Sequence, residues 1–138
     1  PNGEIMESPL IPVSVGELVD KITILRIKKE RLSDQSALAN VARELGELQK
    51  VLDDYIDHSR DVKLFEERLQ VVNEDLWQIE DAIRFKEKER CFDSGFIELA
   101  RRVYLINDER AAIKREINIA VGSVLFEEKS YSDYSPEG

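Results

Sequence analysis

The fold is decided by an early stretch of the chain, Val15-Gly-Glu-Leu-Val-Asp-Lys-Ile-Thr-Ile-Leu-Arg-Ile-Lys-Lys-Glu-Arg-Leu32. Its apolar residues recur at intervals of three and four, which places them on one broad face of an α-helix. Ser14 and Glu17, directly at the start, have the spacing of a capping box, in which each side chain satisfies a backbone N–H of the first turn. This face is too wide for a two-stranded coiled coil and is typical of a helix inside a bundle.

Three later segments repeat the heptad spacing, so the sequence predicts four helices. Their apolar seams run from Leu38 to Tyr55, from Phe65 to Ile83 and from Leu99 to Ala120. Either Asp93 or Ser94 can cap the last helix, and Gly122 is suited to end it. Residues 57–61 contain neither Gly nor Pro, so one continuous helix through them is the main alternative.

We therefore expect a single all-α domain over residues 1–138, an antiparallel four-helix bundle with long, coiled-coil-like helices. Residues 1–13 hold three of the four prolines and predict an extended arm, residues 14–122 form the bundle, and residues 123–138 form a mobile tail. Val124, Leu125 and Phe126 could dock back on the bundle. In an up-and-down topology the basic C-terminal ends of the first and third helices would be neighbours. The helix macrodipole explains why these ends are basic, because it favours cations near a C-terminus.

Composition restricts the function classes. The chain has 138 residues, 36% of them charged, and a net charge of −9. This acidic balance argues against nucleic-acid binding, and no apolar run approaches the ~20 residues of a membrane span. The single cysteine, Cys91, fits a reducing compartment, and we find no signal peptide, so a cytoplasmic location is expected.

Polar residues on the inner faces predict either ion pairs that fix helix register or a small binding pocket. The fourth seam is interrupted by Arg110, which needs a partner if it is buried. Helix registration places Glu74 opposite Arg110 and brings Glu17 and Asp20 to a similar height. The same registration pairs Lys21 with Glu47 and Arg26 with Glu44, and it sets Asp81 or Arg84 near Arg101. The expected polar layer consists of Glu17, Asp20, Lys21, Glu74, Trp77, Asn107, Asp108 and Arg110.

Two anion sites follow as hypotheses from the basic side chains. Arg110 and Lys21 could hold a carboxylate or phosphate inside the polar layer. The second set lies at one end of the bundle. Its pair Arg101 and Arg102 lies near the start of the fourth helix, where the helix dipole disfavours cations. Its members are Arg84, Lys88, Arg101 and Arg102.

Known catalytic patterns do not fit the chain. The only histidine, His58, has no second histidine or nearby cysteine with which to bind zinc, and no Gly-rich phosphate loop is present. Glu44-x-x-Glu47 and Glu17-x-x-Asp20 occur in the reverse order to the magnesium motif of helical nucleotide pyrophosphatases. We therefore expect no metal and no cofactor, assign no catalytic residue, and lean towards a non-enzymatic protein.

Several blocks of the sequence resemble an uncharacterised family of short bacterial all-helical proteins. The blocks are Val15–Lys28, Leu76–Arg84, Phe96–Tyr104, Asn107–Asn118 and Glu127–Tyr131. The resemblance implies a context near glycosyltransferase and surface-polysaccharide functions, but no site residue, because the family is a domain of unknown function.

Two functions are carried forward from the sequence. The leading one is a helical bundle that self-associates, most simply as a dimer, or docks on a protein partner. Its motivation is the broad first helix together with an apolar arm containing Leu10, Ile11 and Val13. The alternative is a bundle that binds or transforms an anionic metabolite, such as a sugar nucleotide.

Overall fold

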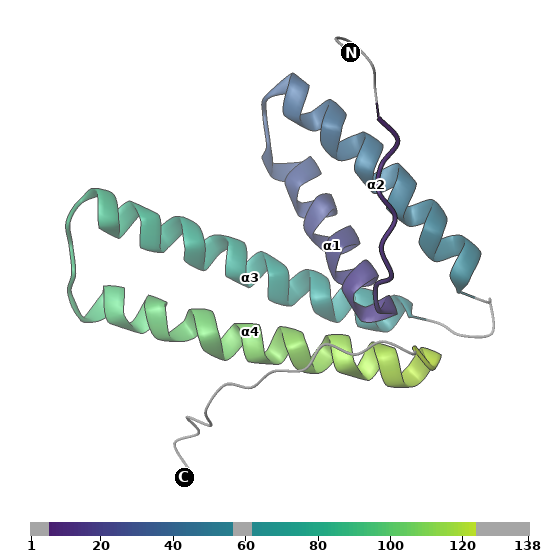
Figure 1. Ribbon diagram of the computed structural model, residues 1–138. Coiled ribbons are helices and arrows are strands. Elements are labelled where there is room, and N and C mark those ends of the chain that lie inside the picture. The colour runs from purple at the N-terminus through teal and green to yellow at the C-terminus, as the bar shows by residue number, and fades with distance from the viewer. Residues whose placement is uncertain (1–5, 57–61, 124–138) are drawn as a thin grey trace.

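The computed structural model describes residues 6–56 and 62–123, and these form four helices. Their bounds are α1 Val15–Arg31, α2 Gln35–Tyr55, α3 Lys63–Lys88 and α4 Ser94–Val121. The expected all-α, four-helix architecture is confirmed (Figure 1). Because α2 ends at Tyr55 and α3 begins at Lys63, the two are separate helices rather than one. His58 and the remaining residues of 57–61, residues 1–5, and the tail from Val124 onward lie outside the described residues.

Helix ends follow the local sequence. The Ser14 hydroxyl accepts a hydrogen bond from the Glu17 N–H at 3.1 Å, as the capping box predicts. Helix α4 is capped by Asp93, whose carboxylate accepts from the Phe96 N–H at 2.9 Å. It ends at Gly122, which has a φ of 70°, a left-handed conformation that glycine adopts without strain.

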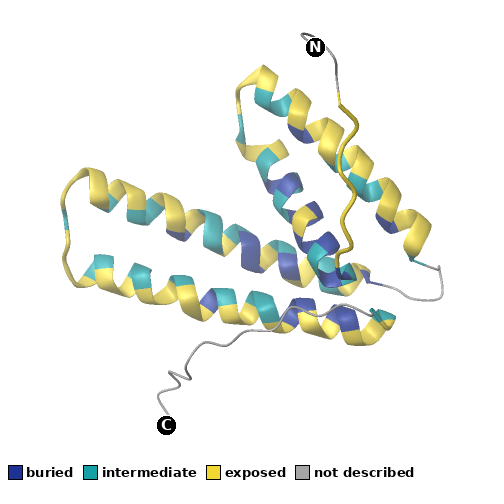
Figure 2. Cartoon of the chain, in the orientation of Figure 1, coloured by how far each residue is buried: buried dark blue, intermediate teal, exposed yellow. Residues whose placement is uncertain are grey.

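The four helices form two antiparallel hairpins that cross each other (Figure 1). Helix α1 contacts the other three helices, whereas within the described residues α2 packs its backbone closely only against α1. The α3–α4 hairpin extends well past the crossing, so its outer half has no third helix over it (Figure 2). This arrangement makes α1 the centre of the fold.

The core lies where α1 crosses α3 and α4. Figure 2 shows the buried residues gathered there. The core residues are Leu18, Val19, Ile22, Leu52, Val62, Leu69, Val72, Ile79, Ile106, Ile113 and Ile117. Residues 6–13 of the arm form no helix, and their apolar side chains lie outside this core, with Leu10 96% exposed and Ile11 74% exposed.

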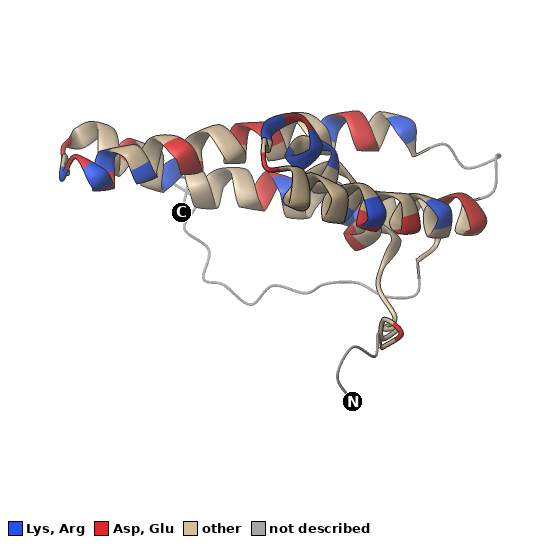
Figure 3. Ribbon diagram, turned by 90° about the horizontal axis from the view of Figure 1, so that it is seen from above, with Lys and Arg blue, Asp and Glu red and all other residues tan. Residues whose placement is uncertain are grey.

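The basic end of α1 lies short of the basic end of α3, because α1 ends over the middle of α3. The Arg31 guanidinium lies 6.0 Å from the centre of the Trp77 ring. Lys88 is eleven residues further along α3, which is about 16 Å at 1.5 Å per residue. Acidic and basic residues alternate along both hairpins (Figure 3), so the expected neighbouring of whole clusters is not found.

Candidate functional site

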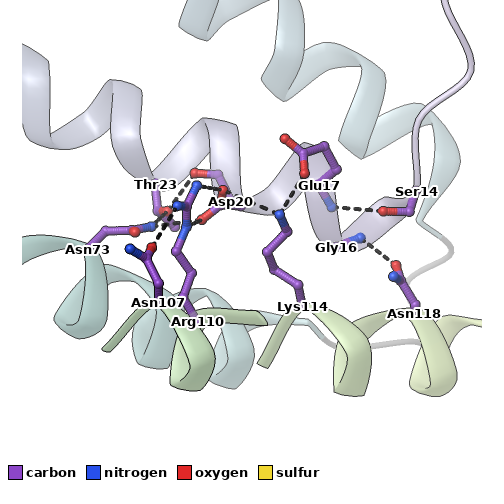
Figure 4. Close-up of polar contacts among 10 residues, drawn as sticks. All are labelled: Ser14, Gly16, Glu17, Asp20, Thr23, Asn73, Asn107, Arg110, Lys114 and Asn118. Atoms are coloured by element: carbon purple, nitrogen blue, oxygen red, sulfur yellow. Dashed lines mark hydrogen bonds and ion pairs between the residues drawn. The ribbon is translucent and has the colours of Figure 1, made fainter. Parts of the chain in front are cut away.

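Asp20 is the centre of a polar network at the crossing of α1 with α3 and α4 (Figure 4). Its side chain is completely buried, although it is an ionisable carboxylate. Arg110 of α4 donates to it twice, from Nε to Oδ1 at 2.9 Å and from NH2 to Oδ2. Asn73 of α3 donates to Oδ1 at 2.9 Å, and the Lys114 Nζ lies 3.9 Å from Oδ2. The buried charge is therefore compensated by cations and by hydrogen bonds.

Two further side chains extend this network. The Thr23 hydroxyl donates to the backbone carbonyl of Asp20 at 2.8 Å and accepts from the Asn73 amide at 2.9 Å. On the opposite side, the Asn107 Oδ1 accepts from Arg110 NH1 at 3.4 Å. Among the described residues, no buried side-chain nitrogen or oxygen lacks a hydrogen-bond partner. Such complete pairing is expected of a network that specifies how helices pack.

The network continues to the start of α1 through an ion pair. The Lys114 ammonium of α4 donates to Glu17 Oε2 at 2.6 Å, and the lysine side chain is only 10% exposed. Glu17 is therefore held by its backbone N–H, which donates to Ser14, and by its carboxylate, which binds a cation from the neighbouring helix. This contact fixes α1 lengthwise against α4.

The first backbone N–H groups of α1 are satisfied by side chains in the last turn of α4 and just after it. The Gly16 N–H donates to Asn118 Oδ1 at 2.7 Å, and the Val15 N–H donates to the Ser123 hydroxyl at 3.4 Å. The helices approach so closely here that a Cβ on Gly16 would lie 2.4 Å from the Lys114 carbonyl oxygen. Only glycine fits this position.

A pocket of about 440 Å³ opens beside this network, between α1 and α3 with Arg110 of α4 at its inner end. It is lined by Ile24, Ile27, Asn73, Leu76, Trp77, Glu80, Asp81, Arg84 and Arg110. The pocket thus combines an apolar wall and one aromatic ring with a charged rim. Of the expected polar layer, only Trp77 and Arg110 line it.

The chain matches a family of unknown function, DUF6165, over residues 10–136. The chain belongs to this family. No curated protein and no solved structure matches it. The match confirms that the chain resembles a family of unknown function, and it includes both Leu10–Val13 of the arm and most of the tail.

In this DUF6165 chain the structure brings together part of the expected polar layer. Arg110 pairs with Asp20 and not with Glu74, so that registration was wrong; Glu74 instead accepts from Gln70 at 3.2 Å. The hairpin crossing explains the difference, because it directs α1 rather than the flank of α3 towards Arg110. Trp77 lines the pocket, as does Arg84, which lies 3.7 Å from Glu80.

Other expected members of the two sites do not line the pocket. Arg26 bonds to Gln49 at 2.8 Å, where Glu44 was expected. Five further members of the expected sites are exposed on the surface: Lys21, Lys88, Arg101, Arg102 and Asp108. Lys21 does not line the pocket beside Arg110, so the expected pairing of these two side chains around an anion is not found. The set expected at the end of the bundle stays a prediction.

Four buried or close-packed members of the network were missed by sequence reasoning. They are Asn73, Lys114, Asn118 and Gly16. A signal was present in the sequence: Asn107, Arg110, Lys114 and Asn118 follow one another at helical spacing, beside the apolar seam of α4.

No helix in the described part of the chain is long and apolar enough to cross a membrane. The same residues contain no group of three or more histidine, cysteine or carboxylate side chains able to hold a metal ion.

A separate charged cluster caps α4 at the turn between α3 and α4. The Lys86 ammonium lies 3.1 and 3.2 Å from the two Asp93 oxygens, and the Cys91 thiol donates to Oδ2 at 3.3 Å. The Phe96 N–H, and after it Lys86 and Cys91, lower the pKa of Asp93 from 3.8 to about 2. The same pairing with Asp93 raises the pKa of Lys86.

Asp93 should therefore contribute to stability in a pH-dependent way. Its folded-state pKa is depressed, so the contribution is complete above pH 3.8 and is lost as the pH falls towards 2. Asn keeps the helix cap but carries no charge. We expect Asp93→Asn to lower the urea midpoint at pH 6, and the difference from wild type to shrink as the pH falls to 2. A difference of equal size at both pH values would contradict this.

Proposed function

We propose that this DUF6165 chain is a non-enzymatic helical protein that associates with a second copy of itself. The observation that carries the proposal is the apolar arm, whose side chains contribute nothing to the described core. Leu10 is 96% exposed and Ile11 is 74% exposed. Consecutive exposed apolar residues of this kind mark interaction surfaces more often than isolated ones. The family match begins within this arm, at residue 10.

The outer half of the α3–α4 hairpin adds to this support. Phe85 is 64% exposed, Phe92 55% and Ile97 58%, beyond the region that α1 covers. By contrast, the polar groups at the helix crossing are paired with one another. The network therefore serves packing, and the surplus apolar surface lies elsewhere. A second copy of the chain would cover that surface symmetrically, which is the commonest form of soluble oligomer.

The full chain should therefore be a dimer in solution. We expect sedimentation equilibrium, from low to high micromolar concentration, to give a mass that approaches twice 15.9 kDa. Raising the salt concentration should leave the association intact, because apolar burial is not screened. A mass of one chain throughout the concentration range would refute the proposal.

A second candidate is binding of an anionic metabolite, because Arg84 and Arg110 line the same pocket. This candidate is less well supported. The Asp20 carboxylate already holds the Arg110 guanidinium from both Nε and NH2, so an anion would compete with an internal partner.

A further inference from the structure

The pocket beside Trp77 has the character of a peptide-binding groove. Three aliphatic side chains, Ile24, Ile27 and Leu76, line it with the indole of Trp77. The indole N–H donates no hydrogen bond within the described part of the chain, whereas such groups usually have an acceptor when bound. The volume of about 440 Å³ suits a few side chains of an extended segment.

The arm has the matching chemistry of a proline-rich ligand. Pro9-Leu-Ile-Pro12 is a P-x-x-P segment, and each proline fixes its own φ near −65°. The residues before them, Ser8 and Ile11, are restricted to extended conformations. Segments of this type form polyproline II helices that dock in aromatic-lined grooves, at low cost in conformational entropy.

We infer that Pro9–Val13 of one chain binds the Trp77 groove of a second chain, in a reciprocal exchange. This inference rests on the proposed self-association and names the surfaces that make it. In this arrangement a backbone carbonyl of the arm accepts from the Trp77 indole, and Leu10 and Ile11 fill the apolar wall. The exposed arm and the open groove are thereby covered together.

The arm does not occupy the groove of its own chain. Leu10 is 96% exposed and Ile11 is 74% exposed, so the groove residues of the same chain cover neither side chain. A second copy of the chain supplies a groove for each arm.

The first test changes the arm of the full-length chain. We expect Leu10→Asp combined with Ile11→Asp to weaken dimerisation at least about tenfold in sedimentation, because two apolar side chains lose their site. The matched control is Met6→Asp, at an equally exposed position outside the Pro9–Pro12 segment, which should leave the dimer unchanged. All three side chains are exposed, so the helices should keep their circular dichroism.

The second test detects the groove directly. Trp77 is the only tryptophan, so its fluorescence reports on this pocket alone. A synthetic peptide of residues 6–14, added to the Leu10→Asp, Ile11→Asp chain, should shift the emission to the blue and saturate. The same peptide with aspartate at both positions should have no effect.

The outcomes separate this inference from the proposed function. If the doubly substituted chain dimerises as wild type does, or if the peptide leaves the emission unchanged, the arm–groove contact is wrong and self-association stands. If wild type is a monomer at all concentrations, the proposed function fails and this inference fails with it.

Discussion

Replacing Asp20 by alanine should lower the free energy of unfolding by about 3–5 kcal/mol, the range found when one partner of a buried ion pair is removed. Asp20 is fully buried and is the shared acceptor of Arg110 and Asn73. Without it, Lys114 and Arg110 stay at the helix crossing with fewer anions, although their side chains are only 10% and 27% exposed. Urea unfolding followed by circular dichroism measures the loss.

The control for Asp20 is Asp54→Ala, which removes an exposed carboxylate from α2. We expect that change to stay within about 0.5 kcal/mol. Combining Asp20→Leu with Arg110→Met should recover much of the loss, because apolar pairs often replace buried ion pairs without cost. If Asp20→Ala and Asp54→Ala were equally mild, the network would not be what holds the hairpins together.

This prediction also bears on the two functional alternatives. If Arg110 serves packing, its replacement together with Asp20 leaves self-association intact and only resets stability. If Arg110 serves an anion, the same double substitution abolishes ligand binding while the fold survives. The stability of the double variant and its oligomeric state therefore have to be measured on the same preparation.

The helices themselves were predictable from local sequence. The capping box at Ser14, the Asp93 cap and Gly122 each act within one turn, so their chemistry depends on neighbours along the chain. Apolar periodicity likewise identified the buried faces, because Ile22, Ile79 and other seam residues are indeed in the core. These features do not depend on how the hairpins are placed.

The partners of Arg110 were only partly predictable. An arginine in an apolar seam requires an anion, and Asp20 was among the expected residues at its height. The choice between Asp20 and Glu74 depends on the crossing of the two hairpins, which heptad spacing does not specify. The same crossing leaves Lys21 in solvent, because it turns that face of α1 away from α4.

Close approach of backbones was the least visible feature in the sequence. Gly16 stands in the first turn of α1, where a glycine is unremarkable by local rules, and Gly46 stands inside α2, where it is unfavourable. Their environments are opposite. Gly16 faces the Lys114 carbonyl at the α1–α4 contact, whereas nothing lies within 4 Å of a Cβ built on Gly46.

Gly16→Ala should therefore destabilise the protein by about 3 kcal/mol, the upper end of the usual range for overpacking. A Cβ would lie 2.4 Å from the Lys114 oxygen and 3.0 Å from Asn118 Oδ1, and the first of these is backbone that cannot rotate away. Relief requires α1 to separate from α4. That movement lengthens the Gly16 hydrogen bond to Asn118, now 2.7 Å, and the Glu17 contact with Lys114.

Gly46→Ala is the matched control, and it should stabilise the protein by about 0.5–1 kcal/mol through helix propensity. Both substitutions remove the same freedom from the unfolded chain, so that term cancels when the two are compared. The difference between their urea midpoints then measures the α1–α4 contact. If Gly16→Ala destabilises the protein and Gly46→Ala stabilises it, the loss of stability comes from that contact, because the covalent change is identical. A neutral or stabilising Gly16→Ala would mean that the two helices do not meet at this glycine.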